Sequence, residues 1–457
     1  MQWQRSIMAF RKTGFILALL AGVWYFQGEA YAAEADYQST QFAVEGFEAP
    51  ARISDGNRTT YSRAETTATV TVTSVEGIEA LYIEFDRLPN VWTLQNADTG
   101  ESVICGQNGF LHEYVSVTEL FGSPAEKLIL EFQTDTVVAD VYGFGEGTLP
   151  DWVQMWQPPL EEADLLLISS HSDDEQLFFL GALPYYAGER GLKVQVAYVV
   201  QHFEANQVQN HVRPHEQLDG LWAVGVRNYP VMSEFPDLYA ESKDRDTAFS
   251  QAVATYEKAG YTYDDFAAYI TKCFRRFKPL VVVSHDLDGE YGHGTHVVCA
   301  KAITQAIELA ADESAFPDSA AEYGTWQPEK VYLHLYQENQ IVMDYDIPLA
   351  HFDGKTAFQV SREGFDCHKS QHWTWFYKWI YGTSENPITK ASQIKNYSPC
   401  RYGLYASKVG ADVIGGDFFE NVVTYEEREK IQRTERLEQI KADIETLGEK
   451  IKQALWV

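Results

Sequence analysis

The sequence predicts a two-domain chain, in which an all-β sandwich precedes an α/β domain built on a doubly wound parallel sheet. Two observations carry this prediction. Short strand patterns separated by turn residues fill residues 36–146, whereas apolar strands alternate with helical patterns in residues 160–423. Residues 147–159, which are rich in glycine and proline, separate the two patterns and are predicted to form a linker.

The first 32 residues predict a signal peptide. They hold three basic residues near the start, an apolar run from Thr13 to Phe26 and the cleavage signal Ala30-Tyr31-Ala32. The run is shorter than the roughly 20 residues that a membrane span needs. We therefore expect a secreted or cell-surface protein, cleaved near Ala32, whose mature chain has no transmembrane segment. An uncleaved anchor is the alternative.

Composition bounds the partners and the metal chemistry. The formal net charge of −30 repels phosphate backbones, so we expect no nucleic acid as a partner. The five cysteines show no C-x-x-C spacing, which argues against a thiolate zinc site and against a dense disulfide framework. A single disulfide between Cys367 and Cys400 stays open.

The β domain is predicted from alternation. Residues 67–75 alternate between threonine or serine and apolar residues, and further short strands follow with turn residues between them. The segment Arg52–Asn57, followed by Thr60-Tyr61, resembles the opening of galactose-binding-like jelly rolls. The resemblance implies an accessory sandwich domain. Whether that domain binds a sugar or only packs against its neighbour is left open.

The second domain alternates buried-looking strands with helices, as a Rossmann-like doubly wound sheet does. No G-x-G-x-x-G follows its first strand, so a nucleotide is not implied. The strands are expected at residues 164–169, 194–200, 229–232, 280–284 and 331–335, and the helices at 174–190, 213–224, 247–274 and 296–310.

Residues 424–457 predict a charged C-terminal helix with one apolar seam. Its apolar residues recur with the 3-4-3-4 spacing of a heptad, surrounded by glutamate, lysine and arginine. We expect this seam to pack on the protein's own domain, and oligomerisation through the helix is the alternative. The seam consists of Leu437, Ile440, Ile444, Leu447 and Ile451.

Metal-binding residue types follow the first strand of the α/β domain. His171 and Asp174 lie three residues apart, so that an imidazole nitrogen and a carboxylate oxygen can converge on one metal ion. Asp173 lies between them and is free to act on a water molecule. In an open α/β sheet, sites form beyond the carboxyl ends of the strands, which is where this segment lies.

A second segment with metal-ligand chemistry follows the strand at 280–284. It contains His293 and His296, and it reaches the same edge of the predicted sheet. Two histidines and an aspartate around an open position are how a catalytic zinc ion is held. Each motif alone is as well explained as a surface or helix-capping feature, and only their conjunction indicates a metal site.

Three motifs together resemble the PIG-L (LmbE-like) family of zinc-dependent de-N-acetylases. His171–Glu175 is similar to the family's H-P-D-D-E signature, and Gly292–His296 is similar to its G-H-x-x-H segment. Arg213–Glu216 resembles its R-x-x-E helix. The resemblance covers about residues 163–310, with residue 423 as its outer limit.

The resemblance implies a role for each matching residue. His171, Asp174 and His296 would hold Zn²⁺. Asp173 would be the general base, and His293 would stabilise or protonate the reacting amide. Arg213 would be a substrate contact.

The chain departs from the family pattern at two places. Ser172 stands where the family has proline, and Gly294-Thr295 replaces a Pro-Asp pair. The second change removes an acid beside the last ligand and puts the orientation of that ligand in doubt.

A polar and aromatic stretch beyond the motifs is predicted to cap the site, with His368 and Gln371 touching substrate; ordinary packing is the alternative for both. The function that the resemblance implies is removal of an N-acetyl group from an N-acetylated amino sugar or glycan. The alternatives are an amidase acting on a non-sugar or thiol-conjugated substrate, and an inactive carbohydrate-binding surface protein.

Overall fold

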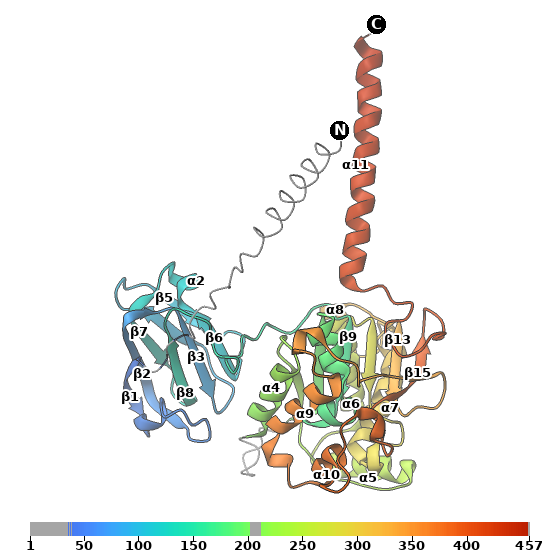
Figure 1. Ribbon diagram of the computed structural model, residues 1–457, viewed down its shortest axis with the longest axis horizontal. Helices are drawn as coiled ribbons and strands as arrows, with labels where there is room; N and C mark the ends of the chain where they lie inside the picture. Colours follow the sequence, from blue (N-terminus) through green and yellow to red (C-terminus); the bar gives the residue numbers. More distant parts are fainter. Residues whose placement is uncertain (1–34, 36, 38, 202–211, 456–457) are drawn as a thin grey trace, which may run out of the picture.

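The computed structural model describes residues 35–455 except 36, 38 and 202–211 (Figure 1). The expected signal peptide lies outside these residues. Among the described residues, no helix combines the length and the apolar character that crossing a membrane requires. Cys367 and Cys400 are both free thiols, so the disulfide left open between them does not form.

The N-terminal domain consists of two sheets that share one long strand. Strand β2 pairs with β8 at its first two residues, and with β1 and β7 farther along. Buried side chains from both sheets, such as Val70 and Ile83, belong to one core. The strands are β1 (Gln41–Phe47), β2 (Ser62–Ile78), β3 (Ala80–Phe85), β4 (Trp92–Asn96), β5 (Ser102–Cys105), β6 (His112–Ser116), β7 (Ala125–Phe132) and β8 (Val137–Phe144).

The second domain is a mixed sheet flanked by helices (Figure 1). Its order is β11-β10-β9-β12-β13-β15-β14, and the first five of these strands are parallel. The sequence reasoning missed the last two strands, β15, which pairs antiparallel with β13, and β14, which pairs antiparallel with β15. The strands are β9 (Leu165–Ser169), β10 (Val194–Val200), β11 (Val231–Phe235), β12 (Val281–Ser284), β13 (Lys330–His334), β14 (Gln340–Val342) and β15 (Arg401–Ser407).

Two of the expected helices are interrupted. The helix expected at 247–274 is two helices, because Gly260 takes a φ of +93° and Thr262 begins a new helix with a capping box. The helix expected at 174–190 is α-helical only over α3 (Asp174–Leu177). The main helices are α4 (Arg213–Ala223), α5 (Arg245–Lys258), α6 (Tyr263–Phe277), α7 (Gly294–Leu309), α9 (Ala357–Cys367) and α10 (Trp375–Tyr381).

The two domains meet through a polar and aromatic interface. Arg58 of the β domain forms ion pairs of 2.5 Å with Glu84 of its own domain and with Asp219 of α4. The ring of Phe110 stacks on Tyr229, with ring centroids 4.6 Å apart. The guanidinium of Arg58 thus compensates the buried carboxylate of Glu84 and at the same time pairs with Asp219, which ties the β domain to α4.

The C-terminal helix α11 (Tyr425–Leu455) extends away from both domains (Figure 1). The five side chains of its apolar seam are 44–64% exposed. The expectation that the seam packs on its own domain is therefore wrong. Heptad spacing shows that a helix needs an apolar partner but not where that partner comes from.

Candidate metal centre

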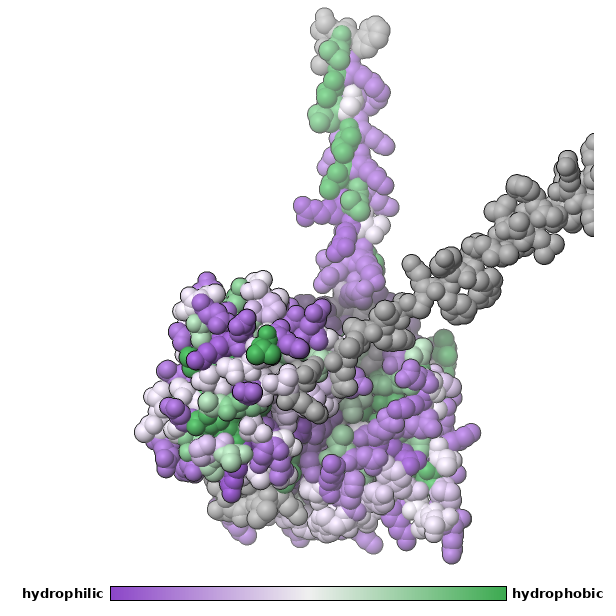
Figure 2. Space-filling view, turned by 60° about the vertical axis from the view of Figure 1, so that its left-hand side comes forward, coloured by the Kyte–Doolittle hydropathy of each residue, from purple (hydrophilic) through white to green (hydrophobic). Residues whose placement is uncertain are grey.

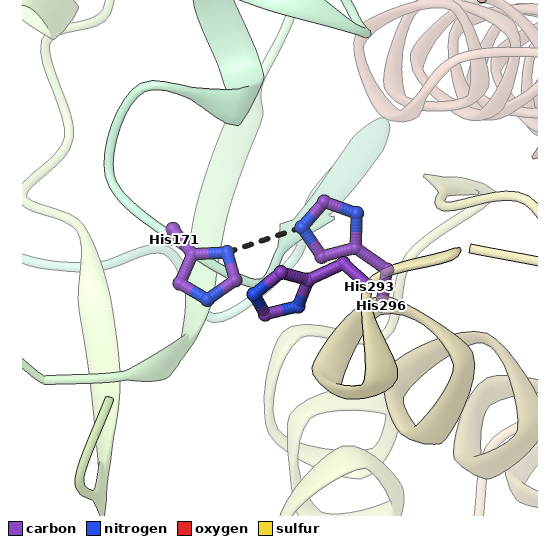
Figure 3. Close-up of side chains that lie close together, drawn as sticks. All are labelled: His171, His293 and His296. Atoms are coloured by element: carbon purple, nitrogen blue, oxygen red, sulfur yellow. Dashed lines mark hydrogen bonds between the residues drawn. The ribbon is translucent and has the colours of Figure 1, made fainter. Parts of the chain in front are cut away.

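The site lies where two neighbouring strands end. Strands β9 and β12 pair in parallel, so the chain leaves both at the same edge of the sheet. His171 follows β9 by two residues, while His293 and His296 lie at the start of α7. Figure 3 shows the ring of His171 facing the other two histidines. All three are buried.

Three ligand atoms converge on one point. The Nδ1 of His171 lies 3.1 Å from both the Oδ2 of Asp174 and the Nε2 of His296, and these last two atoms are 3.3 Å apart. Ligand atoms around a tetrahedral zinc ion with bonds of about 2.0–2.2 Å are separated by roughly 3.3–3.6 Å. His171, Asp174 and His296 therefore fit a divalent metal after small adjustments.

A buried carboxylate orients the histidines behind this triangle. Glu290 accepts hydrogen bonds of 2.7 Å from the Nδ1 atoms of His285, His296 and His334. Burial acts to raise the pKa of Glu290, but the three histidines hold it well below its usual value. Because His296 donates through Nδ1, the lone pair on its Nε2 faces the metal position.

Sequence reasoning gave Glu290 no role. Its only sequence signal is its position between His285 and His293, in a segment that is rich in potential metal ligands.

A second set of three groups, Asp174, His285 and His296, also brings ligand atoms close together. His285 is engaged at both nitrogens, because its Nδ1 donates to Glu290 and its Nε2 accepts from the backbone N–H of Ser170 at 2.8 Å. It therefore supports the site and does not offer a free lone pair.

The backbone of Asp173 takes a conformation that is rare for a residue with a side chain. Its φ is +127°, and its N–H donates to the buried carboxylate of Glu175 at 2.9 Å. Burial raises the pKa of Asp173 to about 7, against the opposing effect of Arg213. A carboxylate with this pKa is suited to accept a proton near neutral pH, and that of Asp173 interacts electrostatically with the neighbouring Asp174.

His293 lies beside the ligand triangle, and with His171 and His296 it forms another group whose ligand atoms lie within 4.8 Å of one another. Its ring centroid is 4.7 Å from those of His171 and His296, and its Nδ1 makes no hydrogen bond to the described residues. Burial, and then these two histidines, hold the pKa of His293 well below its usual value. The neutral ring is therefore available to donate one hydrogen bond to a bound substrate.

Arg213 lies at the site, but it also holds the protein's own loop. Its guanidinium donates to the carbonyl of Ser172 and lies 3.7 Å from Asp173 and 3.9 Å from Asp237. It therefore fixes the loop that carries Asp173, and its substrate contact stays a prediction.

The two residues expected to cap the site, His368 and Gln371, are both buried. His368 is fully buried, with its Nε2 3.3 Å from the Oε1 of Glu175, which favours positioning Glu175 over touching substrate. Gln371 is nearly buried and donates to Ser370, whose N–H and hydroxyl both bind Glu216. Both side chains are buried and contact other residues of the protein, and a direct contact of either with substrate stays a prediction.

Aromatic rings that sequence reasoning did not assign surround His293. Tyr239 is 67% exposed, and its ring centroid lies 5.4 Å from that of His293. On another side, Tyr291 lies 5.5 Å from His293 and 5.7 Å from the half-exposed Trp375 of α10. Only the aromatic run at 373–381 hinted at this surface.

Residues 166–307 match the family model PIG-L, described as GlcNAc-PI de-N-acetylase. This part of the chain is a PIG-L domain. The match confirms the resemblance based on the three motifs, and it contains the ligand triangle, Asp173, Glu290 and His293.

The matching relatives include deacetylases and an amidase. The chain is 26% identical over 189 residues to 1D-myo-inositol 2-acetamido-2-deoxy-alpha-D-glucopyranoside deacetylase 1 of Catenulispora acidiphila, covering 38% of this chain and 56% of the relative. It is 40% identical over 70 residues to mycothiol S-conjugate amidase of Streptomyces coelicolor, covering 15% of this chain and 23% of the relative. The chain thus spans just over half of the first relative.

Solved structures show weaker similarity. N,N'-diacetylchitobiose deacetylase from Pyrococcus horikoshii aligns with a TM-score of 0.38 and 13% identity, covering 58% of this chain and 88% of that one. The lectin-binding domain of lectinolysin, complexed with Lewis b, aligns with a TM-score of 0.20 and 17% identity, covering 25% of this chain and 99% of that one.

Proposed function

We propose that the protein is an exported zinc-dependent hydrolase that removes the acetyl group from the nitrogen of an amino sugar. The observation that carries the proposal is the ligand triangle of His171, Asp174 and His296. Asp173 precedes Asp174 in the sequence, and the two carboxylates interact electrostatically. The PIG-L match supports the reaction class. The strand order β11-β10-β9-β12-β13 is compatible with a Rossmann-like sheet.

The protein groups divide the work of amide hydrolysis. When bound by the triangle, zinc supplies Lewis acidity to the acetyl carbonyl and to the attacking water. Asp173 accepts the proton that the water loses, and its raised pKa suits it to release that proton to the departing amine. Acetate and the free amine are the products.

His293 stabilises negative charge as it develops on the acetyl oxygen. A neutral imidazole donates one N–H hydrogen bond, and a donor aimed at the developing charge lowers the barrier more than it strengthens substrate binding. Arg213 keeps Ser172 and Asp173 in place through its bond to the Ser172 carbonyl.

The sugar part of the proposal is supported by Tyr239, Tyr291 and Trp375. The rings of Tyr239 and Tyr291 both lie near His293, Trp375 contacts Tyr291, and Tyr239 and Trp375 are open to solvent. Aromatic side chains combine an apolar face with a polar edge, which suits the mixed surface of a sugar ring. Export is supported by the sequence pattern of residues 1–32 alone.

Amide hydrolysis on a thiol conjugate is the second candidate, because the 40% identical segment belongs to an amidase that is named for such a substrate. A panel of N-acetylglucosamine, its short oligomers and a mycothiol S-conjugate separates the two candidates by the acid or amine released. Acetate release from the sugars alone supports the proposal. No release from any substrate by zinc-loaded protein would contradict both.

A further inference from the structure

No residue in the described part of the chain buries the apolar seam of α11. Every residue from Ile431 to Gln453 is exposed except Gly448, which is partly buried. Figure 2 shows hydrophobic residues gathered along one side of this helix and polar residues on the others. Exposed apolar surface of this regularity marks an interaction site.

The seam has the geometry of a coiled-coil position set. Leu437, Ile444 and Ile451 take the a positions of a heptad, and Ile440 and Leu447 take the d positions. A seam confined to a and d is narrow, and it matches a second helix better than it matches a broad protein surface.

Charge decides the orientation of that second helix. In a parallel pair, each g residue faces the e residue five positions later on the other helix, which places Arg436 against Lys441 of the second copy. That contact is repulsive and occurs twice. In an antiparallel pair, g faces g, and Asp443 can meet Lys450 of the second copy in two symmetric attractive contacts.

The same charges select one register. Placing Ile444 opposite Leu447 of the second copy also places Ile440 opposite Ile451, and it brings Asp443 to Lys450. Sliding the helices by one heptad in either direction sets like charges face to face, either Asp443 against Asp443 or Lys450 against Lys450. Apolar fit and charge therefore agree in only one of these three antiparallel arrangements.

We propose that α11 pairs with α11 of a second copy of the chain as an antiparallel two-stranded coiled coil, with Ile444 facing Leu447 of that copy. The closed pair buries both seams at once and is symmetric about a two-fold axis, as most homodimers are. The proposal does not depend on the catalytic function.

Light scattering on the full chain tests the association. At about 10–100 μM, a range in which micromolar dimers persist, we expect twice the mass of one chain. Asp443→Lys should weaken the dimer roughly tenfold, and adding Lys450→Asp should restore it, because the swapped pair is again attractive. Glu435→Lys makes the same charge change on the outer face and should leave the dimer intact.

Crosslinking tests the orientation. A zero-length crosslinker applied to a mixture of isotope-labelled and unlabelled chains should join Asp443 of one chain to Lys450 of the other. A chain that stays monomeric throughout the concentration range would overturn the proposal. The same holds if the monomer binds lipid vesicles through α11 instead of pairing. Crosslinks between equivalent ends of α11, which indicate a parallel pair, would overturn it as well.

Discussion

His112 of the β domain and His215 of α4 share a hydrogen bond of 2.7 Å between ring nitrogens, although 103 residues separate them in the sequence. His112 is fully buried, and its other nitrogen is bonded to Gln154 of the connecting segment at 2.7 Å. Because His215 lies two residues after Arg213, the β domain is connected to the helix that holds the loop of Asp173.

This connection predicts a stability effect. His112→Ala removes a buried ring and leaves the side chains of Gln154 and His215 without their hydrogen-bond partner. The substitution should therefore lower the free energy of unfolding by about 2–4 kcal/mol. Denaturant unfolding measures the loss.

A chain that begins near Pro150 should also lose solubility, because removal of the β domain exposes α4. A soluble shortened chain of undiminished stability would instead support the sequence-based view of residues 36–146 as an accessory domain.

The ligand triangle predicts that substitution of any one of its three residues lowers the zinc content of the protein. His171→Ala, Asp174→Ala and His296→Ala each remove one corner of the triangle, so purified variants should hold far less than one zinc per chain. Elemental analysis measures the content. His351→Ala, at an exposed histidine, is the matched control and should keep the metal. Equal zinc in all four variants would refute the assignment.

Asp173→Asn should separate the base from the ligands. The amide cannot accept the proton, so turnover should fall roughly 10²–10⁴-fold while zinc content is retained. Steady-state kinetics and elemental analysis on the same preparation check both statements. A fully active variant would exclude Asp173 as the base.

The pH profile provides a control for the same residue. A carboxyl group is lost as a base when pH falls through its pKa, so kcat/KM should decline on the acid side. The pKa of about 7 applies without metal, and a neighbouring cation favours the carboxylate. The midpoint should therefore lie below about 7, and any residual activity of Asp173→Asn should lack this acid limb.

Glu290→Gln tests the orientation of the histidines. The variant keeps the shape of the side chain but loses its charge, so His296 should be held less firmly by its Nδ1. Loss of such a partner typically lowers metal affinity 10–100-fold. Competition with a chromogenic chelator measures the affinity, and circular dichroism controls for folding. Unchanged affinity in a folded variant would show that Glu290 serves packing alone.

Trp375→Ala tests the aromatic surface. If sugar rings stack on it, KM for oligomers of N-acetylglucosamine should rise roughly 2–10-fold, with little change in kcat. Trp373→Ala is the matched control, since Trp373 is more exposed and is not among the rings that contact Tyr291. Equal effects of the two substitutions would argue against a specific stacking site.

The sequence predicted the parts of the site that local spacing determines. His171, Asp174 and His296 follow strand patterns at ligand spacing, and the structure brings their ligand atoms together. Glu290 and Trp375 were missed, because their roles depend on which distant elements fold against them. The break at Gly260 was missed for another reason: helical periodicity continues on both sides of a residue that ends the helix by its φ angle.

The carboxylate of Glu290 bears on the charge of the ion that the site would bind. Asp174 and Glu290 are both buried, and both contact His296. Negative charge that is buried in a medium of low permittivity costs free energy, and a cation held by the triangle would offset part of that cost. Charge therefore favours a cation at this position, independently of what the donor atoms prefer.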